Sequence, residues 1–101
     1  MTDLPIVCSL TPAALKARRE GLLSRLWLRA DAHEELLEGH RLRFSAADDT
    51  LALIARAVDA ERHCCRFLRF DIRVEPDGGP IVLDMTGPAG TRVFLSALFE
   101  A

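Results

Sequence analysis

Apolar residues recur along this chain with two different periods, alternating with polar residues in some segments and returning every three or four residues in others. Alternation is typical of strands, and the longer period is typical of amphipathic helices. The pattern predicts the element order strand, helix, strand, strand, helix, strand, strand, helix. The expected ranges are residues 4–10, 12–28, 33–37, 40–44, 49–66, 70–74, 81–85 and 89–99.

The residues between these segments indicate where the chain reverses. Thr11-Pro12 is a favourable helix start, because threonine can cap the helix and proline suits its first turn. Glu38-Gly39 separates two alternating runs and predicts a hairpin. Pro76-Asp77-Gly78-Gly79-Pro80 predicts a second reversal, since glycine accepts positive φ and proline stops helices. In the strand 40–44, Leu42 and Phe44 are expected to face inward.

Strands joined by short turns pair antiparallel, and the helices must bury their apolar stripes against the resulting sheet. The sequence therefore predicts the α+β class. The expected architecture is a two-layer sandwich of order βαββαββα, with a mostly antiparallel sheet and helices on one face. The length of 101 residues and an apolar half of the composition fit one domain over residues 1–101.

The second long helix carries the chemistry that is most concentrated in this sequence. Leu51, Ile54 and Val58 define its expected buried stripe, and Cys65 lies within about 20° of Ile54 on a helical wheel. Glu61 lies on the same stripe, one turn before Cys65. A buried carboxylate requires a partner, because an unpaired buried charge is costly.

The first helix offers that partner in Arg19, which falls within its stripe of leucines. Cys64 lies beside Cys65 in the sequence, and Cys8 is expected on the inward face of the first strand. We therefore predict that Cys8, Cys64 and Cys65 form a cluster of thiols, with Glu61 and Arg19 around it. Adjacent cysteines on a helix diverge by about 100°, so a frayed helix end is needed to bring both sulfurs together.

Three functions remain open for this cluster. Soft metal or metalloid ions prefer thiolate sulfur, which makes such an ion the leading ligand, bound by Cys64 and Cys65 with Cys8 as a third ligand. An arginine beside a thiol favours the thiolate, so a thiol-dependent reductase or transferase is the enzymatic alternative. A partner-binding domain whose cysteines only pack is the third. Whether the chain is an enzyme is left open, as is its reaction.

Structural readings stand beside these functional ones. Cysteine behaves as a small hydrophobic residue, and Arg19 with Glu61 is equally well an ion pair that only stabilises the fold. His33, His40 and His63 are expected to be exposed. The segment 87–90 precedes a helix, but it lacks the lysine of a phosphate-binding loop and is expected to be a simple strand-to-helix turn.

Charge and composition exclude other classes of function. Thirteen basic against 15 acidic residues give a net charge of −2, which argues against a strong electrostatic grip on nucleic acid. No apolar run approaches the roughly 18 residues of a membrane span, and the first residues do not resemble a secretory signal. The expected location is therefore the cytoplasm, where three cysteines are expected to stay reduced.

A homodimer is predicted from aromatic residues that fall outside the buried stripes. Trp27 lies off the inward stripe of the first helix, and Phe94 and Phe99 are expected to be only partly covered. A second copy of the chain would cover such surface.

The C-terminal half resembles a family of short bacterial proteins, mostly uncharacterised, with a Glu-x-x-Cys-Cys-x-Phe segment, a hairpin and a Thr-Gly-Pro turn. The matching residues are Glu61, Cys64, Cys65, Phe67, Thr86, Gly87 and Pro88, and the start Cys8 to Thr11 also resembles that family. The resemblance covers most of the chain and implies no particular reaction. It carries an association with resistance to mercury or other heavy metals.

Overall fold

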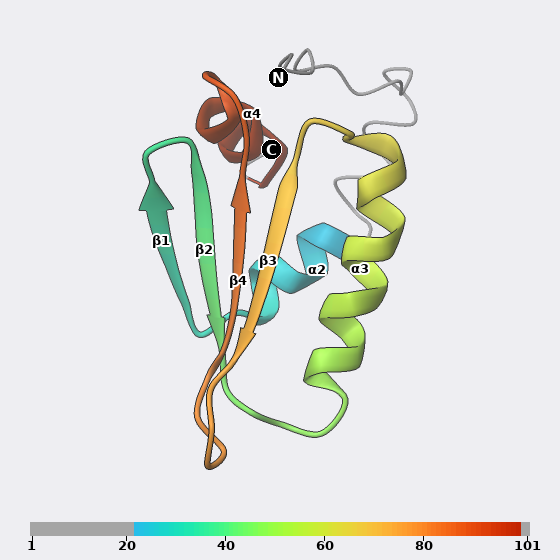
Figure 1. The fold of residues 1–101 in the computed structure, drawn as a ribbon, viewed down its shortest axis with the longest axis vertical. Coiled ribbons are helices and arrows are strands. Elements are labelled where there is room, and N and C mark those ends of the chain that lie inside the picture. The colour runs from blue at the N-terminus through green and yellow to red at the C-terminus, as the bar shows by residue number, and fades with distance from the viewer. Residues whose placement is uncertain (1–21, 100–101) are drawn as a thin grey trace.

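The computed structural model describes residues 22–99, which form a four-stranded sheet and three helices (Figure 1). The strands follow the order β1-β2-β4-β3, and each neighbouring pair is antiparallel. The predicted α+β class is confirmed. The elements are α2 (Leu22–Arg29), β1 (Ala32–Leu36), β2 (Gly39–Phe44), α3 (Thr50–Cys64), β3 (Arg69–Val74), β4 (Ile81–Thr86) and α4 (Thr91–Phe99).

From α2 onward, the order of the elements agrees with the predicted order, and most boundaries differ by one or two residues. The predicted first strand, 4–10, and residues 12–21 of the first predicted helix lie outside the described residues. The single domain over residues 1–101 therefore stays a prediction.

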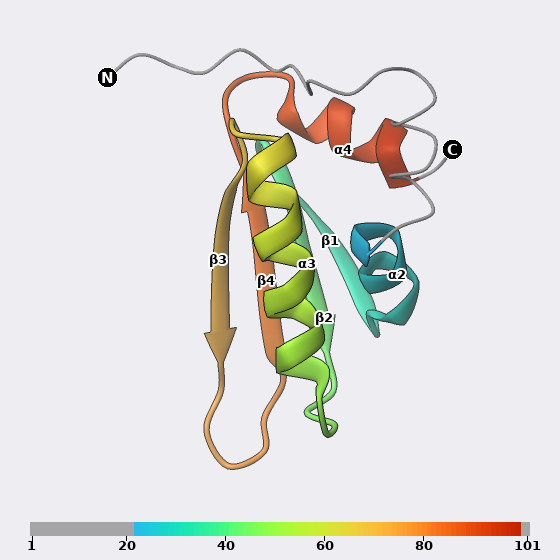
Figure 2. The same ribbon diagram turned by 90° about the vertical axis from the view of Figure 1, so that its right-hand side faces the viewer.

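The helices lie on one side of the sheet, and the core lies between the two layers (Figures 1 and 2). Strand register places Leu42 opposite Leu83 and Phe44 opposite Ile81, so these side chains share the face that the helices cover. Leu42 and Phe44 are buried there, as predicted. Ile54 of α3 is fully buried in the same cluster.

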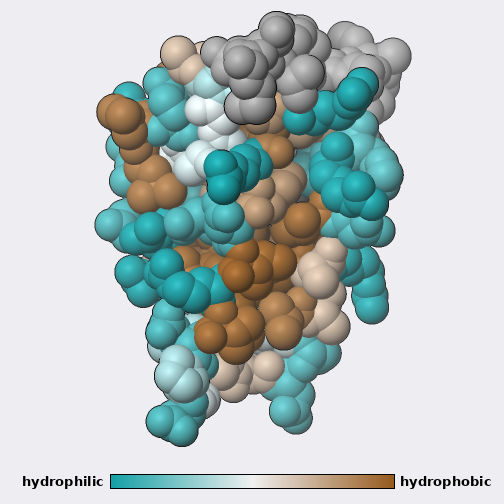
Figure 3. Space-filling model, in the orientation of Figure 1, coloured by the Kyte–Doolittle hydropathy of each residue, from teal (hydrophilic) through white to brown (hydrophobic). Residues whose placement is uncertain are grey.

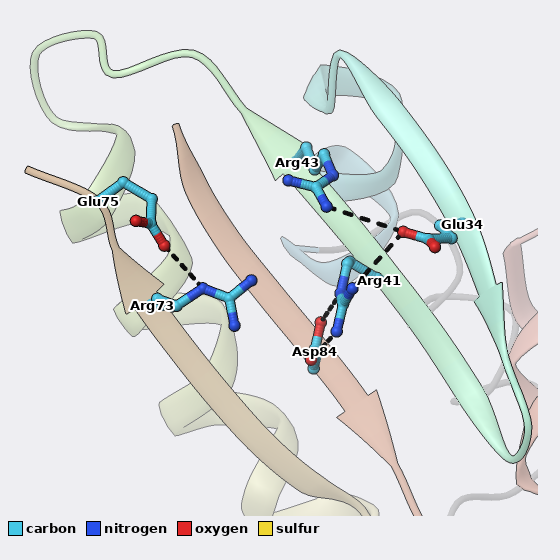
Figure 4. Close-up of polar contacts among 6 residues, drawn as sticks. All are labelled: Glu34, Arg41, Arg43, Arg73, Glu75 and Asp84. Carbon is cyan, nitrogen blue, oxygen red and sulfur yellow. Dashed lines mark hydrogen bonds and ion pairs between the residues drawn. The ribbon is translucent and has the colours of Figure 1, made fainter. Parts of the chain in front are cut away.

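The other face of the sheet carries charged side chains in paired rows (Figure 4). Arg41 donates from Nε and Nη2 to the two carboxylate oxygens of Asp84, at 2.7 and 2.9 Å. These hydrogen bonds raise the pKa of Arg41. Glu34 lies 3.7 Å from Arg41 and 3.9 Å from Arg43. The β1–β2 and β2–β4 pairings thus set opposite charges side by side across these strands, which stabilises the sheet.

The hairpin between β3 and β4 turns where the sequence predicts it. Asp77 and Gly78 both have positive φ, 56° and 71°, and the Gly79 N–H donates to the Pro76 carbonyl at 3.0 Å. This combination is a type I′ turn, whose twist matches that of the flanking strands. The tight turn sets the β3–β4 register.

The turn between β1 and β2 places the Glu38 carboxylate at the start of α4. The Glu38 Oε1 accepts hydrogen bonds from the N–H groups of Gly90, at 3.0 Å, and Arg92, at 3.5 Å. The first N–H groups of a helix lack partners within the helix and favour negative charge. The segment 87–90 is therefore a strand-to-helix turn capped by a carboxylate of the same chain.

Two sequence predictions about burial are wrong. His40 was expected to be exposed, but it is only 3% exposed and faces α4. Leu51 was expected on the buried stripe of α3, but it is 43% exposed. The buried face of α3 includes Ala57 as well as Ile54, so it is rotated away from Leu51.

Candidate thiol site

The C-terminal end of α3 points a polar group and a thiol into the core. Ile54, Ala57, Glu61 and Cys65 are buried in succession, at intervals of three or four residues. The helix ends at Cys64, and Cys65 follows with φ −112° and ψ 75°. The Cys65 N–H still donates to the Glu61 carbonyl at 2.9 Å, which holds Cys65 on the buried side after the helix has ended.

Glu61 and Cys65 contact each other through their side chains. Each is 1% exposed, and the Cys65 thiol donates to the Glu61 Oε1 at 3.5 Å. The predicted inward orientation of both residues is confirmed. Their role in a metal site stays a prediction.

The other members of the predicted cluster lie beyond what the structure describes. Cys8 and Arg19 lie outside residues 22–99. Cys64 belongs to α3, but its side chain is outside the described side chains. The distances among the three sulfurs, and the predicted pairing of Arg19 with Glu61, therefore stay predictions.

The chain after the two cysteines folds back against the core. The Leu68 N–H donates to the Cys65 carbonyl at 3.0 Å, and both Phe67 and Leu68 are buried. The Phe67 ring meets the Phe94 ring of α4 edge to face, with centroids 5.2 Å apart. This aromatic pair joins the end of α3 to α4.

Gly87 allows this segment to approach the start of α4. A Cβ at position 87 would lie 3.1 Å from the Phe67 carbonyl oxygen and 2.5 Å from the Thr91 Oγ1. Thr91 is fully buried and donates from Oγ1 to the Pro88 carbonyl at 2.7 Å. The two motifs quoted above, at residues 61–67 and 86–88, therefore meet in space, and a glycine is required at their junction.

A cluster of aromatic and histidine rings beside α2 was missed from the sequence. Trp27 stacks between His33 and Phe99, with ring centroids at 3.9 and 4.4 Å. The His40 ring meets Trp27 edge-on, and its Nε2 lies 3.1 Å from the Ser96 Oγ. The position of His40 two residues before Leu42 was a signal for its burial, because alternate residues of a strand share a face.

Among the side chains described in residues 24–99, no group of three or more His, Cys, Asp or Glu residues is arranged to hold a metal ion. A centre of the predicted kind therefore depends on Cys64 and Cys8. His63 is exposed, as predicted, on the outer side of α3.

No family model, curated protein or solved structure matches this chain. The resemblance to the short bacterial proteins therefore stays a prediction. Within residues 22–99, none of the helices has the length and apolar character needed to cross a membrane.

Proposed function

We propose that this protein binds a soft metal or metalloid ion through thiolates at the C-terminal end of α3. The observation that carries the proposal is the buried contact between the Cys65 thiol and the Glu61 carboxylate, next to a second cysteine in the sequence. The pair places a thiol, the preferred ligand of soft ions, beside a carboxylate on the buried side of the helix end.

The burial of Cys65 favours an ion over a large substrate. Reactive cysteines that attack substrates lie in partly exposed positions, whereas Cys65 is 1% exposed. An ion needs only a small opening to reach the sulfur, and thiolates are the preferred ligands of soft ions. Binding requires the thiol to lose its proton, and a bound cation replaces that proton on the sulfur, next to the Glu61 carboxylate.

The end of α3 between the two cysteines supports a site with two sulfurs. Within a helix, Cys64 and Cys65 would diverge by about 100°. Cys65 lies outside helical geometry, so its direction relative to Cys64 is not set by the helix. We propose Cys64 and Cys65 as the primary ligands, Cys8 as a third, and Glu61 with Arg19 in contact with them.

The test is a titration of the reduced protein with Hg(II), Cd(II) or As(III), followed by calorimetry and by ligand-to-metal absorption. We expect the wild type to bind one ion. Cys64→Ser and Cys65→Ser are each expected to weaken binding by more than about tenfold, because losing a direct ligand costs more affinity than losing a residue that only orients a ligand. Cys8→Ser tests the third ligand.

Asp59→Asn is the matched control, because Asp59 lies on the exposed side of the same helix. Circular dichroism of each variant separates loss of binding from loss of folding, and Cys64→Ser keeps the buried Cys65 intact. Equal and weak binding by wild type and Cys64→Ser/Cys65→Ser contradicts the proposal. Rapid alkylation of either cysteine by iodoacetamide at about pH 6 supports the enzymatic alternative instead.

A further inference from the structure

The strand β3 ends the described sheet and leaves apolar side chains uncovered. Within residues 22–99, β3 pairs only with β4. Ile72 is 38% exposed and Val74 is 56% exposed, although both lie on the face that the helices cover elsewhere. Figure 3 shows hydrophobic side chains gathered along β3 and toward α3. An apolar edge strand is a template for pairing with another strand.

The backbone of β3 has hydrogen-bonding groups directed away from β4. The Glu75 N–H donates to the Pro80 carbonyl at 3.2 Å, which places residue 75 among those that bond to the β4 side. In an antiparallel ladder, the direction of these groups alternates from one residue to the next. The pairing of β3 with β4 runs without a bulge, so Phe70, Ile72 and Val74 direct their backbone N–H and C=O groups outward.

The charges on the outer face of β3 alternate in sign along the strand. Arg69 lies 3.5 Å from Asp71, and Arg73 lies 2.8 Å from Glu75. All four of these side chains are at least 40% exposed. Figure 4 shows Arg73 and Glu75 on this face, apart from the network around Arg41. Along the strand the charges are basic, acidic, basic and acidic. An antiparallel copy of the same strand can therefore place an acid opposite each base.

We propose that a second copy of this chain pairs antiparallel with β3, with Ile72 of one copy opposite Ile72 of the other. This register places Asp71 opposite Arg73 and Arg69 opposite Glu75, each twice by symmetry. Opposite charges in direct cross-strand positions stabilise a pair of strands. The outward backbone groups of Phe70, Ile72 and Val74 then meet the same groups of the second copy.

Neighbouring registers are unfavourable because they place like charges opposite each other. A two-fold axis at Asp71 would place Asp71 against itself and Arg69 against Arg73, and an axis at Arg73 would place Arg73 against itself. Like charges in these positions are destabilising. On the opposite face, the Ile72 register joins Phe70 to Val74 across the axis and covers the exposed apolar side chains. The alternating charges therefore select one partner and one register.

The surface differs from the one expected from the sequence. Trp27, Phe94 and Phe99 are half-buried, and Trp27 is stacked within its own chain between His33 and Phe99. Ile72 and Val74 of β3 are more exposed than these aromatic residues. The proposed pairing does not involve the thiol site, so its outcome and that of the ion titration are independent.

The first experiment is sedimentation equilibrium of the reduced full chain from about 1 μM to about 1 mM, a range that resolves weak association. A reducing agent prevents disulfides from linking the copies. We expect a dimer whose association constant falls about tenfold or more in Asp71→Arg, because two attractive pairs become repulsive. The double variant D71R/R73D restores opposite charges across the axis and is expected to recover dimerisation.

Asp59→Arg is the matched control, since Asp59 is an exposed acid on α3 and not on the strand that pairs. It is expected to dimerise like the wild type. A monomer over the whole concentration range overturns the proposal. A dimer that Asp71→Arg leaves unchanged also overturns it, because another surface must then hold the copies together.

Amide exchange followed by NMR tests the register directly. On dimerisation, the amides of Phe70, Ile72 and Val74 are expected to gain protection as the protein concentration rises. The amides of Asp71 and Arg73 already bond toward β4 and are expected to change little. Protection that rises equally at all five positions, or at none, contradicts the alternating pattern that this pairing requires.

Discussion

Glu61 shows how one side chain can determine the chemistry of a helix end. Its carboxylate is 1% exposed and accepts a hydrogen bond from Cys65, within a stripe that is otherwise apolar. Helical periodicity predicts the burial of both residues, because they follow Ile54 at helical intervals. Strand alternation places His40 on the same face as Leu42, but its contact with Ser96 depends on where α4 crosses β2.

Glu61→Gln is the most direct test of this residue in the proposed site. Glutamine preserves the size and one acceptor oxygen of the side chain but removes its charge. We expect the affinity for Cd(II) to fall about tenfold, as for other groups that orient a metal ligand, while the circular dichroism spectrum is unchanged. The measurement is calorimetric titration, with Asp59→Asn as control. Unchanged affinity would assign Glu61 a purely structural role.

At the scale of elements, glycines at two turns have different functions. Gly39 begins β2, and a Cβ at this position would overlap the carbonyl oxygen of Met85 in β4. Gly78 has a φ of 71° in the β3–β4 turn but has open space around it. The first glycine allows two strands to approach each other, and the second allows the chain to reverse.

The same substitution is therefore expected to have different effects at these two positions. Gly39→Ala is expected to lower the free energy of unfolding by about 3 kcal/mol, because the β2–β4 pairing must shift. Gly78→Ala is expected to cost about 1 kcal/mol from the left-handed backbone alone. Urea denaturation measures both values. Equal losses would show that the close approach at Gly39 relaxes easily.

At the scale of the whole molecule, the sheet and the helices share one core. Leu95 of α4 is fully buried in the same cluster as Leu42 of β2 and Ile54 of α3. Both termini of α4 are also fixed, by Glu38 at its start and by the Phe99–Trp27 stacking at its end. The described elements are therefore expected to unfold together.

Leu95→Ala tests this shared core. We expect it to lower the free energy of unfolding by about 3 kcal/mol, since it leaves a cavity between α4 and the sheet. Val93→Ala on the exposed side of α4 is the matched control, with an expected change below about 0.5 kcal/mol. Denaturation is followed by circular dichroism and tryptophan fluorescence. Transitions that separate in Leu95→Ala would show that α4 unfolds independently.

The sequence by itself determined the order of the described elements, the antiparallel hairpins and the inward positions of Glu61 and Cys65. These features follow from local periodicity and turn chemistry, which depend on residues close together in the chain. Only the tertiary structure decided which way α3 rotates, and so left Leu51 exposed. It also brought Phe67 against Gly87 and Phe94, and left β3 at the edge with Ile72 uncovered. Contacts between distant segments depend on how layers pack, and no local pattern contains that information.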